Sequence, residues 1–241
     1  MRLNKYLSET GACSRREADA WIEAGRVQVN GATAVLGTQV AEGDEVLLDG
    51  RAVAARPPRM YLALNKPVGI ECTTDREVRD NIVDFVAHRE RIFPIGRLDK
   101  DSEGLILLTN DGDIVNRVLR AEHEHEKEYI VSVDRPLTPG FLEGMSRGVP
   151  ILGTVTNPCR VRQVGRNTFR IVLTQGLNRQ IRRMCEHFDY TVRRLQRVRI
   201  MHIHLGDLPV GKWRSLTDAE VRPLLPAERS ARRATLTLKK G

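Results

Sequence analysis

Gly96-Arg97-Leu98-Asp99-Lys100-Asp101-Ser102-Glu103-Gly104-Leu105 is the most informative segment of this chain of 241 residues. It is polar and bounded by glycines, and the apolar run that follows it, residues 105–109, predicts a buried strand. Loops held by such rigid elements often carry function. From the pattern alone, however, Asp99 is more simply a turn residue that pairs with Arg97. The segment therefore raises a catalytic role for Asp99 without establishing one.

The chain around this loop predicts an α+β domain. We expect strands at residues 61–64, 105–109, 129–133, 168–174 and 199–205, and helices at residues 113–120 and 180–188. The strands do not alternate regularly with helices, which favours a largely antiparallel mixed sheet. Residues 61–225 are thus expected to form one domain. The basic residues 226–241 are expected to be a disordered tail.

The first 55 residues predict a separate, small domain. Leu3 and Leu7 lie on one face of a helix expected over residues 2–10. Ser14 and Glu17 have the spacing of a capping box, which would start a second helix ending near residue 24. Strands are expected at residues 26–30, before an Asn-Gly turn, and at residues 46–48. Two prolines favour a linker at residues 56–60.

The charge of the chain indicates an anionic partner. The formal net charge is +8 and the sequence pI is about 9.7. Residues 160–201 carry eleven arginines against two acids, Glu186 and Asp189, which is a local charge of +9. The planar guanidinium suits two-pronged phosphate contacts and stacking on bases, so nucleic acid is the expected partner.

Several kinds of chemistry have no support in the sequence. The cysteines, Cys13, Cys72, Cys159 and Cys185, are too scattered for a zinc site or a disulfide framework, so reduced thiols are expected. Residues 123–126, His-Glu-His-Glu, fit a solvated loop better than a metal site. No phosphate loop or dinucleotide fingerprint occurs. We expect no metal, no cofactor and no membrane segment, with a cytoplasmic location and a monomeric state as defaults.

The first domain resembles the S4 RNA-binding domain. The matching stretches are residues 2–7, 13–18 and 25–31. The resemblance implies that Arg2, Lys5, Arg15 and Arg16 line a helical face that contacts RNA phosphates. The alternative is a solvated charged face, which the net charge of −2 over residues 1–55 favours.

The second domain resembles the pseudouridine synthases, and specifically the bacterial branch that modifies ribosomal RNA. Arg97-Leu98-Asp99, followed by Ser102 and Gly104-Leu105, matches their signature loop. Residues 64–69, 127–129 and 176–184 match three further stretches in the expected order. The resemblance implies isomerisation of uridine to pseudouridine in structured RNA, without a cofactor. Large-subunit (23S) ribosomal RNA is the expected substrate, with a tRNA as a second candidate.

The same resemblance implies a role for each site residue. Asp99 would be the catalytic carboxylate, either as a nucleophile or as a base. Arg182 would reach Asp99 and keep it charged, while Tyr129 would stack on the base and assist the final deprotonation. Leu195 would pack on the other side of the base, although an ordinary core leucine is the alternative. Arg97 would fill the space that the base vacates. Arg179 and Arg183 are expected to contact phosphates because they belong to the arginine-rich run of residues 160–201.

Two other functions remain open from the residues alone. A non-catalytic RNA-binding factor in ribosome assembly would keep the arginines but would not need Asp99, Tyr129 and Arg182 together. A nucleoside hydrolase could use Asp99 and Asp101 as paired carboxylates. Hydrolysis would release the base, whereas isomerisation retains it in the RNA.

Overall fold

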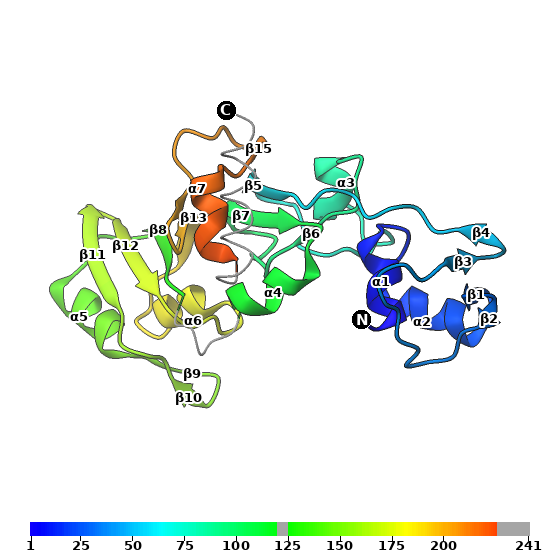
Figure 1. Ribbon diagram of the computed structural model, residues 1–241. Coiled ribbons are helices and arrows are strands. Elements are labelled where there is room, and N and C mark those ends of the chain that lie inside the picture. The colour runs from blue at the N-terminus through cyan, green and yellow to red at the C-terminus, as the bar shows by residue number, and fades with distance from the viewer. Residues whose placement is uncertain (120–124, 226–241) are drawn as a thin grey trace. The chain divides into compact units, whose positions relative to one another are not determined.

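The protein is described here by a computed structural model, which defines residues 1–119 and 125–225. The expected tail, residues 226–241, and part of the loop 123–126 lie outside these described residues. The chain divides into two compact units, coloured from blue to red along the sequence in Figure 1. Unit 1 comprises Met1–Met60, His88–Ile92 and Asn110–Gly112, and unit 2 comprises Tyr61–Ala87, Phe93–Thr109 and the chain from Asp113 onward.

Unit 1 consists of two helices and a small antiparallel sheet. Its elements are α1 (Leu3–Glu9), α2 (Arg15–Glu23), β1 (Val27–Val29), β2 (Ala32–Thr33), β3 (Val46–Leu48) and β4 (Arg51–Ala52), with strand order β2-β1-β3-β4. Leu3, Leu7 and Val27 are buried in its core. The predicted capping box is present, because the Ser14 hydroxyl accepts from the Glu17 N–H at 3.2 Å while the Glu17 carboxylate accepts from the Ser14 N–H at 2.6 Å.

Unit 2 is built on one mixed sheet. Its strands are β5 (Tyr61–Lys66), β6 (Phe93–Pro94), β7 (Glu103–Thr109), β8 (Lys127–Val133), β11 (Arg160–Gly165), β12 (Thr168–Leu173), β13 (Val192–Ile200), β14 (Ile203–His204) and β15 (Trp213–Ser215). The main order is β11-β12-β8-β13-β7-β5-β15, with β6 beside β7 and β14 beside β13. Among the described pairs only β13 and β7 run parallel. The predicted α+β class with a largely antiparallel mixed sheet is confirmed.

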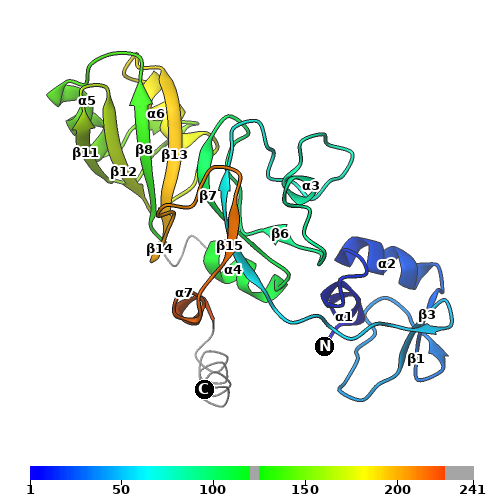
Figure 2. The ribbon, with the colours of Figure 1, turned by 90° about the horizontal axis from the view of Figure 1, so that it is seen from above.

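Two apolar cores lie against this sheet. Helices α5 (Pro139–Arg147) and α6 (Gln180–Glu186) lie against the strands β8, β12 and β13, as Figures 1 and 2 show. Phe141, Met184 and Phe169 are buried between these layers. Helices α4 (Gly112–Leu119) and α7 (Asp218–Val221), followed by the short turn of 3-10 helix Arg222–Leu224, form the second core with β5 and β7. The remaining elements are α3 (Ile82–Val86), β9 (Pro150–Ile151) and β10 (Thr154–Val155).

One predicted strand is wrong. Residues 199–205 do not form a single strand, because the chain turns at Met201, whose φ is +54°. Strand β13 instead begins at Val192 and ends at Ile200, and β14 folds back on it in antiparallel register. The apolar residues on both sides of the turn hid it in the sequence.

Candidate active site

The segment from Gly96 to Ser102 connects β6 to β7 and is held from both sides. Within the loop, the Ser102 N–H donates to the Asp99 carbonyl at 3.0 Å, which closes a tight turn over residues 99–102. The buried Arg197 of β13 donates from Nε to the Leu105 carbonyl at 2.7 Å and from Nη1 to the Arg97 carbonyl at 3.3 Å. The loop is therefore fixed to a central strand of the sheet, which holds its side chains in defined positions.

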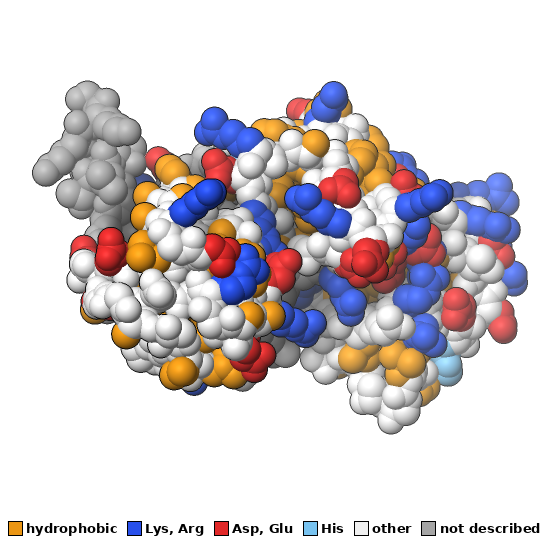
Figure 3. Space-filling view, turned by 90° about the vertical axis from the view of Figure 1, so that its right-hand side faces the viewer, with side chains coloured by type: hydrophobic (Ala, Val, Ile, Leu, Met, Phe, Trp, Pro, Cys, Tyr) orange, Lys and Arg blue, Asp and Glu red, His pale blue; other side chains and the backbone are white. Residues whose placement is uncertain are grey.

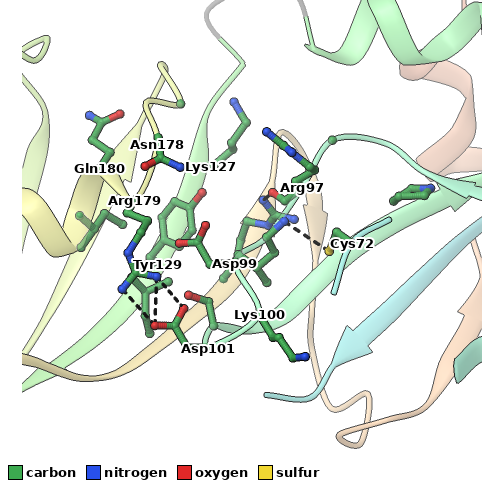
Figure 4. A pocket seen from close by; sticks show the side chains of 18 of the residues that line it. Cys72, Arg97, Asp99, Lys100, Asp101, Lys127, Tyr129, Asn178, Arg179 and Gln180 are labelled. Carbon is green, nitrogen blue, oxygen red and sulfur yellow. Dashed lines mark hydrogen bonds and ion pairs between the residues drawn. The ribbon is translucent and has the colours of Figure 1, made fainter. Parts of the chain in front are cut away.

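This loop forms one wall of a cleft of about 1340 Å³ in unit 2. The predicted site residues of this unit meet there: Arg97, Asp99, Tyr129, Arg179, Arg182 and Leu195 all line it. In Figure 4 the Asp99 carboxylate lies next to the Tyr129 ring, and both point into the cleft. Asp99 and Tyr129 are half-buried, Arg97 is exposed, and Leu195 is buried. Residues that lie far apart in the sequence thus share one cavity, although their roles stay predictions.

The two arginines at the start of α6 meet Asp101. Arg179 donates to both carboxylate oxygens of Asp101 at 3.1 Å, as the dashed lines in Figure 4 show. Arg182 donates from Nη2 to the Asp101 carbonyl at 2.9 Å and to the Ser102 hydroxyl at 3.1 Å. Its Nε lies 3.4 Å from the Asp101 carboxylate. Arg179 is the N-cap residue of α6 and Arg182 lies in its first turn, and both side chains reach the same acid.

This arrangement corrects the expected contact of Arg182. We expected Arg182 to reach Asp99, but among the described residues no hydrogen bond or ion pair joins the two. Arg182 binds Asp101 instead, because Asp101 lies directly opposite the first turn of α6. Burial would raise the pKa of Asp101, but the hydrogen bonds from Arg179 and the charge of Arg182 outweigh burial and lower this pKa below its usual value.

Two lysines, the buried Lys66 and the half-buried Lys127, lie near the cleft. The Lys66 ammonium is fully buried and donates to the carbonyls of Pro67 at 2.9 Å and Ile70 at 2.8 Å. Lys127 lines the cleft beside Tyr129 and donates to the His125 carbonyl at 3.3 Å. Burial lowers the pKa of both ammonium groups, and the charge of Arg197 lowers that of Lys127 further.

The sequence interpretation missed part of this site. It assigned no role to Lys66, Cys72, Asp101 as an anchor, or Arg197. Cys72 lines the cleft, and its sulfur accepts from the Leu98 N–H at 3.4 Å. Burial raises the pKa of this thiol, which therefore stays protonated at neutral pH. Lys66 lies in a stretch that matched the family, residues 64–69, and that match was the available signal.

The other predicted RNA-binding residues lie outside the cleft. Arg15 and Arg16 are exposed at the start of α2, and Arg2 is exposed just before α1. Lys5 forms an ion pair with Glu9 at 3.6 Å. Arg183 lies on α6, where its Nε donates to the Asn178 carbonyl at 3.1 Å. On the face that Figure 3 shows, basic side chains lie among acidic ones.

Comparisons with known proteins agree with this fold and cleft. The model of the family described as RNA pseudouridylate synthase matches residues 60–187, and that of the S4 domain matches residues 1–46. The chain is 59% identical over 223 residues to the dual-specificity RNA pseudouridine synthase RluF of Escherichia coli K12, a match covering 92% of this chain and 77% of that one. It is 35% identical over 232 residues to ribosomal large subunit pseudouridine synthase B of Bacillus subtilis, covering 92% and 95% of the two chains.

A solved structure gives the same result. The crystal structure of a pseudouridylate synthase superimposes with a TM-score of 0.68 at 27% identity, covering 93% of this chain and all of that one. The chain therefore belongs to the RNA pseudouridylate synthase family and carries an N-terminal S4 domain. Its activity is the isomerisation of uridine to pseudouridine in RNA, as the resemblance predicted, and a non-catalytic assembly factor is not favoured.

The described residues also bear on membrane association. Over residues 1–119 and 125–225, every helix is too short or too polar to cross a bilayer.

Proposed function

We propose that the protein modifies large-subunit ribosomal RNA, that tRNA is a second substrate, and that Asp99 is its catalytic carboxylate. The names of the two relatives support the substrates, since one is a large-subunit enzyme and the other has dual specificity. The observation that carries the assignment of Asp99 is its place in one cleft with Tyr129, Leu195 and Arg182. We further propose a monomer that acts in the cytoplasm, since one chain lines the whole cleft and ribosomal RNA is found there.

The reaction rearranges bonds within one nucleotide. The N1–C1′ bond breaks, the uracil turns, and a C5–C1′ bond forms. The proton on C5 leaves and N1 gains one, so the RNA keeps its mass and no oxidant is needed. Asp99 can take part either by attacking the sugar or by accepting the proton from C2′. Both routes need its carboxylate next to the bond between sugar and base, and both stay open.

Tyr129 and Leu195 are proposed to hold the base while it turns. Tyr129 offers a flat ring and Leu195 an apolar side chain, and both line the cleft beside Asp99. A uracil between them would stay in plane yet be free to rotate, because neither surface fixes it by hydrogen bonds. The Tyr129 hydroxyl is the proposed acceptor of the C5 proton. The Leu195 side chain also contributes to the core beneath the cleft, so it serves packing as well.

The target base must first leave its stack, which costs a few kcal/mol. Arg97 is exposed on the loop next to Asp99, and we propose that it fills the vacated space. Arg179 is proposed to contact the phosphate beside the target once RNA competes with Asp101. Arg183, on the next turn of α6, would contact a neighbouring phosphate.

The S4 unit is proposed to add affinity without chemistry. Arg2, Lys5, Arg15 and Arg16 belong to α1, α2 or the residue before α1, and three of them are exposed. They would contact phosphates of the same RNA.

The deciding experiment maps pseudouridine in ribosomal RNA and tRNA from cells with and without this protein. We expect at least one uridine of large-subunit RNA to be modified only when the protein is present. The Asp99→Asn variant should abolish this modification while RNA affinity stays within a few-fold of wild type. Asp207→Asn, at an exposed carboxylate outside the cleft lining, is the matched control and should be active. An identical uridine pattern in both kinds of cell would overturn the proposed substrate.

A further inference from the structure

The arginines of residues 160–201 lie on two opposite faces of the sheet of unit 2. Along β12, Phe169, Ile171 and Leu173 are buried under α5 and α6, while Arg170 and Val172 alternate with them and point the other way. On β8, Tyr129 lines the catalytic cleft and Glu128 lines a second cavity of about 350 Å³. Arg179 and Arg182 thus belong to the cleft, whereas the arginines of β11 and β12 belong to the opposite face.

Strand register brings these opposite-face residues into rows. Arg160, Val172, Glu128 and Arg199 lie directly across from one another on β11, β12, β8 and β13. In the next row Arg162 lies directly across from Arg170. Side chains opposite one another on adjacent strands share a face and are close enough to interact. We call Arg160, Arg162, Arg170 and Arg199, with Glu126 and Glu128, the arginine face.

Glu126 and Glu128 hold three of these guanidinium groups in place. Glu128 accepts from Arg170 and from Arg199, both at 2.6 Å. Glu126 accepts from Arg199 at 2.9 Å and from Arg160 at 2.6 Å. Arg199 is the centre of this network, and its side chain is only 13% exposed. Each carboxylate thus serves two arginines, so the guanidinium groups are oriented before any ligand arrives.

The network leaves an excess of positive charge and hydrogen-bond donors without an acceptor among the described residues. Four arginines face two carboxylates, and Arg160 is 73% exposed. Within residues 1–119 and 125–225, Arg162 has neither a hydrogen bond nor an ion pair, and the buried Nε of Arg170 has no hydrogen-bond partner. Like charges directly across two strands repel each other. An anion between Arg162 and Arg170 would offset this repulsion and satisfy the free donors.

We propose that the arginine face is a second RNA contact, which binds backbone phosphates of a segment other than the one in the catalytic cleft. This inference rests on the proposed function, because a structured RNA is the polyanion that the protein must bind. Guanidinium forks match phosphate oxygens, and binding to phosphates carries no sequence requirement. A large folded RNA can reach both faces of the sheet, whereas an isolated hairpin fills only the cleft. The arginine face should therefore contribute affinity for large RNA and little for a hairpin.

The test compares the Arg160→Gln/Arg162→Gln variant with an Arg135→Gln/Arg147→Gln control, which removes the same charge from exposed arginines outside the arginine face. Affinity is measured over a range of salt concentrations for protein-free large-subunit ribosomal RNA and for a uridine-containing hairpin cut from it. For the long RNA we expect about tenfold weaker binding and a salt slope that is less steep by about one for each lost phosphate contact. Hairpin affinity and turnover should equal those of the control.

A second variant guards against an effect on folding. Arg162→Gln alone breaks no hydrogen bond or ion pair among the residues that the structure describes, so it should fold normally and still lower the salt slope for the long RNA by about one. Equal slopes and affinities in variant and control would overturn the second RNA contact. An acidic segment of a partner protein would then be the next candidate ligand for the arginine face. Pseudouridine formation by wild type, measured in the same samples, reports separately on the proposed function.

Discussion

Asp101 is the residue that sets the positions of both arginines at the start of α6. Its carboxylate is half exposed, and it still accepts three hydrogen bonds from Arg179 and lies within 3.4 Å of Arg182. RNA phosphates would compete with this carboxylate for Arg179. Asp101 therefore has two opposing effects, since it orders Arg182 beside the cleft and also weakens the attraction of the cleft for RNA.

The Asp101→Asn variant should separate these two effects. Losing the negative charge should tighten RNA binding a few-fold, whereas the looser Arg182 should lower the single-turnover rate about tenfold, or about 1.4 kcal/mol in the barrier. Binding and single-turnover assays on one RNA hairpin measure the two quantities, with Asp207→Asn as the control. An unchanged rate would contradict a positioning role for Asp101, and unchanged binding would contradict its competition with RNA for Arg179.

Arg182→Lys should lower activity more than Asp101→Asn does. One ammonium nitrogen cannot replace both Nη2, which donates to the Asp101 carbonyl and the Ser102 hydroxyl, and Nε, which lies 3.4 Å from the Asp101 carboxylate. We expect the single-turnover rate to fall about a hundredfold, or about 2.7 kcal/mol in the barrier. Arg147→Lys, at an exposed arginine outside the cleft lining, serves as the control and should keep the wild-type rate. A wild-type rate for Arg182→Lys would show that charge alone suffices at this position.

At the scale of elements, the parallel pairing of β7 with β13 holds the loop that carries Asp99. Gly104 has a φ of +105° and lies across from Arg197, and a Cβ added there would meet the Arg197 carbonyl oxygen at 2.3 Å. Gly104→Ala should therefore push the two strands apart and destabilise the protein by about 3 kcal/mol. Urea unfolding measures this change. Gly140→Ala, in open space on α5, should stay within about 1 kcal/mol of wild type; equal stability of the two variants would contradict the close approach.

Helix α7 begins with a capping box whose acid is also paired with Arg214. The Arg214 hydrogen bonds at 2.7 and 2.8 Å lower the pKa of Glu220 to about 2, against the opposing effect of burial. The Glu220 carboxylate is charged in the folded state down to lower pH than in the unfolded state. Its stabilisation is thus complete above about pH 5 and is lost as the pH falls toward 2.

Glu220→Gln should keep the capping box, since glutamine also serves at this position, and remove only the charge. At pH 7 we expect a loss of about 1 kcal/mol in the free energy of unfolding. The difference from wild type should shrink steadily as the pH is lowered from 5 toward 2. Urea unfolding at several pH values tests this, with exposed Glu42→Gln as the control. A difference that does not depend on pH would rule out the Arg214 pair as its source.

The elements also show what the sequence could predict. Local signals were sufficient for α2, whose capping box lies within four consecutive residues, and for β7, an uninterrupted apolar run. Contacts between distant segments left no such signal. The parallel pairing of β13 with β7, and the pairing of Arg182 with Asp101 rather than Asp99, depend on residues about 80 or more positions apart. The family resemblance was sufficient to predict several of the residues that line the cleft, whereas the hydrogen bonds among them could be seen only in the structure.

At the scale of the whole molecule, the net charge of +8 is spread over several surfaces. The predicted domain of residues 1–55 illustrates this, because it carries a net charge of −2 and yet exposes Arg15 and Arg16 together at the start of α2. A negative domain can bind RNA only if such a local cluster faces the phosphates. The salt dependence of binding counts those contacts, since each phosphate neutralised steepens the logarithmic slope by about 0.9.

The Arg15→Gln/Arg16→Gln variant therefore tests whether the S4 unit binds RNA. If both arginines contact phosphates, the slope should become less steep by about two, while the rate at saturating RNA stays unchanged because the cleft lies within unit 2. Arg51→Gln/Arg89→Gln removes the same charge from other exposed positions of unit 1 and should keep the wild-type slope. A wild-type slope for Arg15→Gln/Arg16→Gln would mean that this helical face is merely solvated, and that the affinity for RNA comes from unit 2.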